Sequence, residues 1–321
     1  MRYVEKLIRT LVATLLVLAV PSLAGAVQDN QARSILVTGA TTGIGRNLAE
    51  TLAGEGYHVY AGARTDSEMA ELNAIKNMTA VRLDVTKQDQ IDAAVAMIRN
   101  KDTGLYGLVN NAGIGGGGPV LETTIEDQTR VYQVNVEGVY RITKAFAPLI
   151  IESKGRITTT GSVAGTISNA GFNAYSGSKH WIEAFTDALA DEMSSKGVAV
   201  SVIEPGNYQT HIRRNTVLAA FAKVTAAGGE INDDMQKMYD RTEAYELSFK
   251  KPDEVTEAFM HALFDDEPLR RYMVTPSQRE RDYAIGIKVQ QLVELNHWGP
   301  HRYSRDQLVE MLDKTLAASA K

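Results

Sequence analysis

Short apolar runs alternate with helix-forming segments along most of this chain, and this alternation restricts its possible folds more than any other feature. Residues 35–38, 58–61 and 80–83 are such runs, and helix-prone segments lie between them. Strands that are buried on both faces read as continuous apolar runs, and parallel strands need helical crossovers. The pattern therefore predicts an α/β fold, a Rossmann-type doubly wound parallel sheet with helices on both faces.

The alternation continues toward the C-terminus. Further strands are predicted at residues 107–109, 155–160, 198–203 and 271–274, and helices at 45–55, 88–99, 125–150, 175–194, 251–263 and 304–317. Residues 206–249 carry two helix-prone segments, 216–225 and 233–247, without clear strands. We interpret this region as a small helical insert that covers the substrate. A single domain over residues 35–321 accommodates all of these elements.

The composition excludes several classes of function. The chain has 321 residues, 44% of them hydrophobic and 23% charged, as in a globular protein with a substantial core. The net charge of -5 and the dispersed basic residues give no support to nucleic-acid binding. The chain has no cysteine, which excludes disulfides and thiolate sites, and its six histidines lack ligand-like spacing, so we expect no metal site.

The first 26 residues have the pattern of a targeting segment. Arg2, Lys6 and Arg9 precede an apolar run at residues 11–20, and Ala24-Gly25-Ala26 offers a small-x-small cleavage site. This favours a signal peptide over residues 1–26, with a linker at 27–34, and a retained membrane anchor is the main alternative. In either case the domain would be exported or membrane-anchored. A plain N-terminal extension would leave it cytoplasmic.

A glycine-rich turn joins the first predicted strand to the first helix. Its sequence is Thr38-Gly39-Ala40-Thr41-Thr42-Gly43-Ile44-Gly45, with G-x-x-x-G-x-G spacing. Glycines permit a tight turn there and let backbone N–H groups approach a pyrophosphate at the helix N-terminus. At the first strand–helix connection of this fold, the turn predicts dinucleotide binding. The residues expected to take part are Gly39, Thr42, Gly43, Ile44 and Gly45.

Tyr175 and Lys179 lie four residues apart on a predicted helix, so their side chains share one face. A tyrosine with its ordinary pKa of about 10 is a poor acid or base at neutral pH, and a nearby cation lowers that pKa. Lys179 is the candidate for this cation. The pair can therefore exchange a proton with a substrate, although the same spacing also occurs on solvated helices.

Several motifs occur in the order found in the short-chain dehydrogenase/reductase family, which this chain resembles over residues 38–210 and more weakly to about residue 275. They are the T-G-x-x-x-G-I-G turn, Asp84-Val85, Asn110-Asn111-Ala112-Gly113, Asn135, Ser162, the Y-x-x-x-K pair, and Pro205-Gly206 followed by Thr210. The resemblance implies that the protein interconverts a carbonyl and an alcohol by hydride transfer with a nicotinamide cofactor.

The resemblance also implies a role for each of these residues. Tyr175 would be the general acid/base, Ser162 would hold the substrate oxygen, and Lys179 would bind the cofactor ribose and lower the Tyr175 pKa. Asn135 would anchor a water that connects Lys179 to solvent. Cofactor contacts are expected from Asp84 with the adenine amino group, Asn111 near the adenosine ribose, Thr210 with the carboxamide, and from Val85, Pro205 and Gly206.

The end of the second predicted strand bears on the choice of cofactor. In Ala63-Arg64-Thr65, no carboxylate stands at position 63 to accept a hydrogen bond from an adenosine 2'-hydroxyl. Arg64 can instead pair with a 2'-phosphate. The sequence thus favours NADP(H) over NAD(H), with a solvated surface arginine as the alternative reading of Arg64.

The sequence indicates the substrate less clearly than it indicates the cofactor. Apolar candidates for its lining come from residues 165–173 and from the insert, where they are Ile212, Val217, Leu218, Phe221, Met235, Met238 and Tyr239. A resemblance of residues 251–275 to the steroid and retinol dehydrogenase branch implies an apolar, steroid-, retinol- or lipid-like substrate, and the family implies a homodimer or homotetramer. The alternatives are a catalytically silent dinucleotide-binding sensor or partner module, and an epimerase or dehydratase, which the turn spacing and Pro205-Gly206 disfavour.

Overall fold

Seven parallel strands form one sheet in the order β3-β2-β1-β4-β5-β6-β7. The computed structural model describes residues 33–101 and 104–319, so the predicted targeting segment lies outside the described residues. The strands are Ser34–Val37 (β1), His58–Ala63 (β2), Met78–Arg82 (β3), Gly107–Asn110 (β4), Arg156–Thr160 (β5), Ala199–Pro205 (β6) and Arg271–Val274 (β7). The predicted doubly wound sheet is confirmed, and the strand order reverses beside β1.

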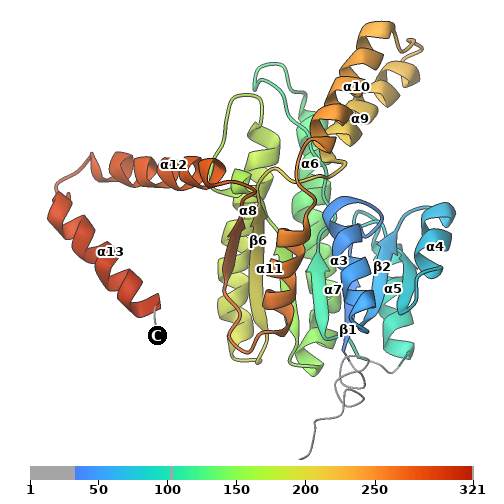
Figure 1. Cartoon of the computed structure of the whole chain (residues 1–321), viewed down its shortest axis with the longest axis horizontal. Coiled ribbons are helices and arrows are strands. Elements are labelled where there is room, and N and C mark those ends of the chain that lie inside the picture. The colour runs from blue at the N-terminus through green and yellow to red at the C-terminus, as the bar shows by residue number, and fades with distance from the viewer. Residues whose placement is uncertain (1–32, 102–103, 320–321) are drawn as a thin grey trace, which may run out of the picture.

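Helices cover both faces of this sheet (Figure 1). They are Gly43–Gly54 (α3), Asp66–Asn73 (α4), Gln88–Asn100 (α5), Ile125–Tyr132 (α6), Val139–Glu152 (α7), Asn173–Ser194 (α8) and Asp253–Phe264 (α11). Alternate residues of β1 point to opposite faces: Ile35 packs with the apolar sides of α3 and α11, and Leu36 packs with those of α5, α7 and α8. Both residues are fully buried, as expected for a strand covered on two sides.

The helix predicted over residues 125–150 is interrupted. Between α6 and α7 the backbone forms a π-helical segment, Gln133–Gly138 (η1), which contains Asn135. Such segments are rare and occur frequently at functional sites. Apolar periodicity does not distinguish a π turn from an α turn, so this segment was not predicted.

The two helices of the insert stand above the carboxyl edge of the sheet (Figure 1). They are Ile212–Ala226 (α9), which begins earlier than predicted, and Asp233–Leu247 (α10), which matches the predicted range. Two further helices, Gln278–Asn296 (α12) and Arg305–Ser319 (α13), project away from the sheet (Figure 1). The sequence predicted α13 but not α12. Among the residues that the structure describes, no helix combines the length and apolar character needed to cross a bilayer.

Candidate active site

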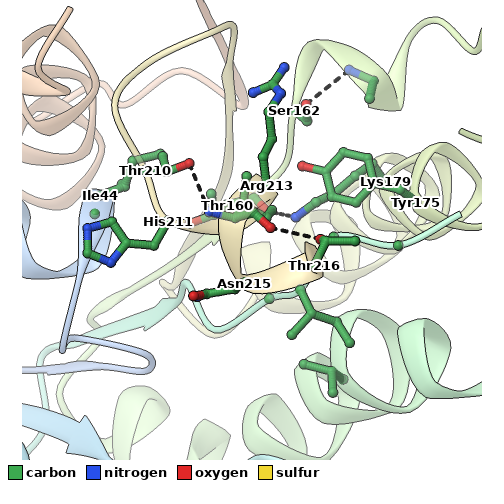
Figure 2. Close-up of a pocket in the computed structure, with 18 of the residues that line it drawn as sticks. Ile44, Thr160, Ser162, Tyr175, Lys179, Thr210, His211, Arg213, Asn215 and Thr216 are labelled. Carbon is green, nitrogen blue, oxygen red and sulfur yellow. Dashed lines mark hydrogen bonds between the residues drawn. The ribbon is translucent and has the colours of Figure 1, made fainter. Parts of the chain in front are cut away.

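A cavity of about 940 Å³ opens at the carboxyl edge of the sheet, beside the point where the strand order reverses. Ligands bind at this position in open α/β sheets. Nearly all of the predicted site residues line the cavity: Gly39, Thr42, Gly43, Ile44, Arg64, Asp84, Val85, Asn111, Ser162, Tyr175, Lys179, Pro205, Gly206 and Thr210. Gly45 and Asn135 are not in the wall. The tertiary structure therefore brings residues from seven segments of the chain into one site, part of which is drawn in Figure 2.

The glycine-rich turn has the geometry of a phosphate cradle. Gly39 and Gly43 have φ angles of +63° and +57°, a conformation that favours glycine. Thr42 is the N-cap of α3 but makes no side-chain capping hydrogen bond within the described part of the chain, and the first turn of α3 carries no acidic residue. The N–H groups and the positive end of the helix dipole are thus available to an anion. The turn fits the pyrophosphate of a dinucleotide.

Asn111 holds this turn in place. Its Nδ2 donates hydrogen bonds to the carbonyl oxygens of Thr38 and Gly39, at 3.0 and 3.1 Å. Its Oδ1 accepts a hydrogen bond of 3.1 Å from the Thr160 hydroxyl. The side chain therefore ties the ends of β1, β4 and β5 together. Its contact with a ribose stays a prediction, whereas its bracing of the turn is observed.

The end of the cavity near β2 and β3 carries Arg64 and Asp84. The Arg64 side chain is exposed and forms no ion pair with any residue in the described ranges, and its backbone is fixed by Glu68 and Arg82. Burial acts to raise the pKa of Asp84, but hydrogen bonds from the Thr86 hydroxyl and N–H outweigh it and leave that pKa below its usual value. Asp84 is thus a carboxylate. The positive charge of Arg64 also lowers the Asp84 pKa, and its exposed guanidinium can bind an anion at the cavity wall.

Ser162, Tyr175 and Lys179 converge on the opposite part of the cavity (Figure 2). The Lys179 Nζ donates a hydrogen bond of 2.7 Å to the Thr160 carbonyl oxygen and lies 5.7 Å from the centre of the Tyr175 ring. Burial lowers the pKa of Lys179 to about 8, against the opposing charge of Glu183. Lys179 is therefore a buried ammonium close to its titration point.

The pKa of Tyr175 is raised by burial, and two neighbours oppose the increase: a hydrogen bond with Ser162 and the positive charge of Arg213. Arg213 was not among the residues singled out from the sequence. Arg213 lines the same cavity, and its side chain is drawn beside Tyr175 in Figure 2. At neutral pH the Tyr175 hydroxyl is protonated and can act as an acid.

Asn135 lies just behind the cavity wall and is almost fully buried. Its Nδ2 donates to the Ile114 carbonyl oxygen and to the Ser178 hydroxyl, both at 3.0 Å, and its Oδ1 accepts from the Ile114 N–H at 2.9 Å. These bonds join η1 to the loop after β4 and to α8. Asn135 thus braces the helix that carries Tyr175, and its link to a water stays a prediction.

The insert contributes a different lining from the one expected. Of its apolar candidates, Ile212 and Val217 line the cavity. Leu218 and Met238 are exposed, and Phe221 packs near Tyr239. Polar side chains in the lining that were not predicted from the sequence include Arg130, Asn207, His211, Arg213, Glu280 and Tyr283, the last two from α12.

A buried acidic pair lies behind Lys179. Glu204 on β6 is 2% exposed, and burial together with the negative charge of Glu183 raises the pKa of Glu204 to about 7. Glu183 accepts a hydrogen bond of 3.0 Å from the Nε of Arg271. Glu204 therefore keeps its proton in the folded protein at pH values where the unfolded chain has released it.

This pair predicts a pH-dependent stability. The folded pKa of Glu204, about 7, exceeds the unfolded value of 4.5, so its contribution to the free energy of unfolding is lost as the pH rises through this interval. A Glu204→Gln protein cannot ionise there. Relative to the unmutated protein, we expect it to gain roughly 1–3 kcal/mol of stability between pH 5 and pH 8, measured by urea unfolding. Glu126→Gln, at an exposed site on α6, is the control, and parallel curves for Glu204→Gln and the unmutated protein would contradict the prediction.

Comparison with known proteins agrees with this geometry. The family model described as short chain dehydrogenase matches residues 33–219. The mitochondrial D-beta-hydroxybutyrate dehydrogenase of Bos taurus is 34% identical over 273 residues, which cover 78% of each chain. Retinol dehydrogenase 5 of Mus musculus is 33% identical over 252 residues, 74% of this chain and 79% of the relative. The crystal structure of a short-chain dehydrogenase from Streptomyces avermitilis matches with a TM-score of 0.68 at 28% sequence identity. The matched region covers 83% of this chain and 95% of the Streptomyces chain.

A doubly wound sheet with a phosphate cradle and a serine, tyrosine and lysine in one cavity defines a dinucleotide-dependent oxidoreductase. The chain belongs to the short-chain dehydrogenase/reductase family. It is accordingly an NAD(P)-dependent dehydrogenase that acts on CH–OH groups.

Proposed function

We propose that the protein interconverts a carbonyl and a primary or secondary alcohol with Tyr175 as general acid/base, and that it prefers NADP(H). The observation that supports this most directly is the convergence of Ser162, Tyr175 and a buried Lys179 in the cavity that also holds the phosphate cradle. A catalytically silent sensor would have no need to keep a buried lysine with a lowered pKa beside a half-buried tyrosine.

In the proposed mechanism a bound nicotinamide supplies or accepts the hydride. Ser162 donates a hydrogen bond to the substrate oxygen and so fixes its position beside the Tyr175 hydroxyl. Tyr175 gives a proton to that oxygen as the carbonyl is reduced and removes it in the reverse direction. The positive charges of Lys179 and Arg213 stabilise the phenolate that Tyr175 becomes in the reductive direction.

The function is tested with purified protein, NADPH or NADH, and a panel of aliphatic and aromatic ketones and aldehydes. We expect oxidation of the reduced cofactor with at least one class of carbonyl compound, and formation of the matching alcohol. Cofactor binding without any turnover across the panel would favour the sensor or partner module instead.

Cofactor preference leads to a separate prediction at Arg64. Replacing Arg64 with Ala is expected to lower kcat/KM for NADPH roughly tenfold or more, because a charge-assisted pair with the 2'-phosphate is lost, and to leave kcat/KM for NADH within about twofold. Steady-state kinetics with each cofactor measure this. Lys87→Ala is the matched control, since Lys87 is an exposed cation near Asp84 that does not line the cavity. Equal losses with both cofactors at Arg64→Ala would contradict NADP(H) preference.

An apolar body is proposed for the substrate, because Ile114, Ile167, Ile212 and Val217 line the part of the cavity that the insert covers. The names of the relatives specify hydroxybutyrate in one case and retinol in another. Export or anchoring through residues 1–26 and homo-oligomer formation stay predictions, which N-terminal sequencing of the native protein and light scattering can test.

A further inference from the structure

We propose that Arg213 binds a carboxylate of the substrate, so that the molecule reduced or oxidised here is an oxo or hydroxy acid with an apolar body. This inference rests on the proposed function, because it places the acid in the same cavity as Tyr175. It narrows the substrate from an apolar alcohol or ketone to one that carries a negative charge.

Arg213 is held in a fixed position facing the cavity. It lies at the start of α9 and its side chain is half-buried. One guanidinium nitrogen donates a hydrogen bond of 2.7 Å to the Asn207 Oδ1, and the guanidinium carbon lies 5.6 Å from the centre of the Tyr245 ring and 5.3 Å from that of Phe249. An arginine stacked on aromatic rings loses little further freedom when it binds a ligand.

The charge of Arg213 is not neutralised by the protein. Within residues 33–101 and 104–319, it forms no ion pair with a carboxylate. Its partner Asn207 also binds a carboxylate, since the Asn207 N–H and Nδ2 donate hydrogen bonds to Glu280, each at 3.0 Å. Asn207 thus stands between the two charges, with its amide oxygen toward Arg213 and its amide nitrogen toward Glu280. A cation in a cavity with only a neutral partner is a site for an anion.

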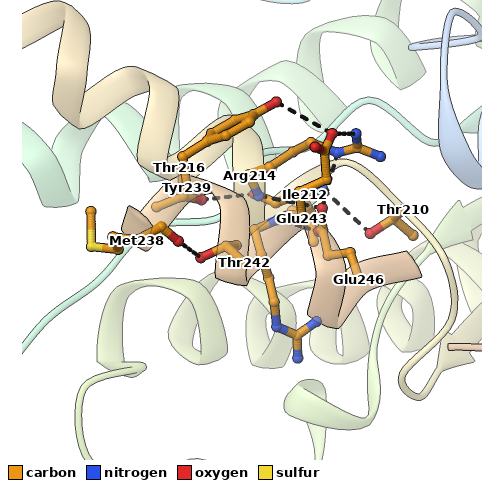
Figure 3. A network of polar contacts seen from close by, with 10 residues as sticks. Thr210, Ile212, Arg214, Thr216, Met238, Tyr239, Thr242, Glu243 and Glu246 are labelled. Atoms are coloured by element: carbon orange, nitrogen blue, oxygen red, sulfur yellow. Dashed lines mark hydrogen bonds and ion pairs between the residues drawn. The ribbon is translucent and has the colours of Figure 1, made fainter. Parts of the chain in front are cut away.

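Arg214, the next residue, differs from Arg213 because its guanidinium pairs with two carboxylates (Figure 3). Arg214 pairs with Glu243 at 2.5 Å and with Glu246 at 3.2 Å, which ties α9 to α10. The Glu246 carboxylate, 1% exposed, also accepts the Arg213 backbone N–H at 2.7 Å. The backbone N–H of Arg213 is therefore hydrogen-bonded to α10, whereas its guanidinium lies in the cavity wall.

The position of Arg213 favours a carboxylate of the substrate. Arg213 and Tyr175 line the same cavity and are drawn beside each other in Figure 2, so a bound carboxylate would lie near the carbonyl that Tyr175 protonates. The planar guanidinium fork matches both carboxylate and phosphate. Glu280 adds a negative charge beyond Asn207, which opposes a doubly charged phosphate more strongly than a singly charged carboxylate.

Calorimetric titration of the NADP⁺-loaded protein with hexanoate and with hexanamide tests the inference without turnover. We expect hexanoate to bind roughly tenfold or more tightly than hexanamide, and Arg213→Gln to abolish this difference. Arg213→Lys keeps the charge without the fork and is expected to retain part of the preference. Lys223→Gln removes a charge from the same helix at a site that pairs with Asp127 outside the cavity, and is expected to change nothing.

Three results would overturn the inference: equal binding of the two ligands, no binding of either, or an Arg213→Gln protein that loses affinity for NADP⁺ instead of hexanoate. The last result would assign Arg213 to a phosphate of the cofactor. Thermal unfolding checks that each variant is folded. Turnover of oxo acids and their methyl esters separates the two proposals. Reduction of esters and acids alike leaves the proposed function standing and removes this inference. Arg213-dependent binding of hexanoate without any turnover contradicts the proposed function, and it then supports Arg213 only as a carboxylate-binding residue.

Discussion

A Tyr175→Phe protein is expected to lose roughly 100- to 10,000-fold in kcat, the range that a positioned general acid/base contributes. The phenylalanine keeps the ring, and so the packing of α8, but removes the only hydroxyl proposed to exchange a proton with the substrate oxygen. Cofactor affinity should change little, because the phosphate cradle at Gly39 and Gly43 is untouched. Steady-state kinetics and equilibrium binding of NADP⁺ measure the two quantities separately.

Tyr140→Phe is the matched control for this experiment. Tyr140 is 52% exposed on α7, outside the cavity, and its ring lies 6.3 Å from that of Phe185. The same loss of one hydroxyl is expected to leave kcat within about twofold, as for a surface substitution away from any specific feature. Full turnover by Tyr175→Phe on a cognate substrate would remove Tyr175 from the mechanism.

Replacing Gly45 with Ala is expected to weaken cofactor binding roughly tenfold or more and to destabilise the fold by about 1–3 kcal/mol. A Cβ at this position would come well inside van der Waals contact of the Asn111 side-chain amide and the Gly39 carbonyl oxygen. One of these is backbone, so the turn itself has to shift, and its N–H groups move with it. Titration with NADP⁺ and urea unfolding provide the measurements.

Gly54→Ala is the matched control, because it makes the same glycine-to-alanine change in α3 at a position away from the turn. A Cβ at Gly54 would meet nothing within 4 Å, and alanine favours the helix, so this variant is expected to gain up to about 1 kcal/mol of stability and to bind the cofactor normally. If Gly45→Ala binds NADP⁺ as tightly as Gly54→Ala does, then the close approach of Gly45 to Gly39 is not needed for the cradle.

Gly45 and Asn135 illustrate what sequence motifs convey about a site. Both belong to the predicted set, yet neither lines the cavity. Gly45 allows α3 to start close to the Gly39 backbone, and Asn135 holds the loop at Ile114 against α8. The motif identifies positions that the site needs, but it does not separate residues that touch a ligand from residues that hold others in place.

Arg213 is the opposite case, a residue that lines the cavity but was not predicted from the sequence. Nothing in its local sequence marks it as different from Arg214, since both are arginines at the start of an amphipathic helix. The structure separates them because Glu243 and Glu246 lie on the side of Arg214, and Asn207 and two aromatic rings lie on the side of Arg213. This distinction depends on the packing of α9 against α10, and periodicity alone does not supply it.

The sequence by itself determined the parallel sheet, the phosphate-binding turn and the Tyr175–Lys179 pair, because strand and helix periodicity, glycine conformation and i,i+4 spacing are local properties. Only the tertiary structure decided the π segment at Asn135, the contribution of α12 to the cavity wall and the lack of an ion pair at Arg213 among the described residues. These features come from contacts between residues far apart in the chain, such as Asn207 with Glu280, 73 positions away. The physical reason is that the partner of a buried polar group is set by packing, whereas the local pattern sets only the element that carries it.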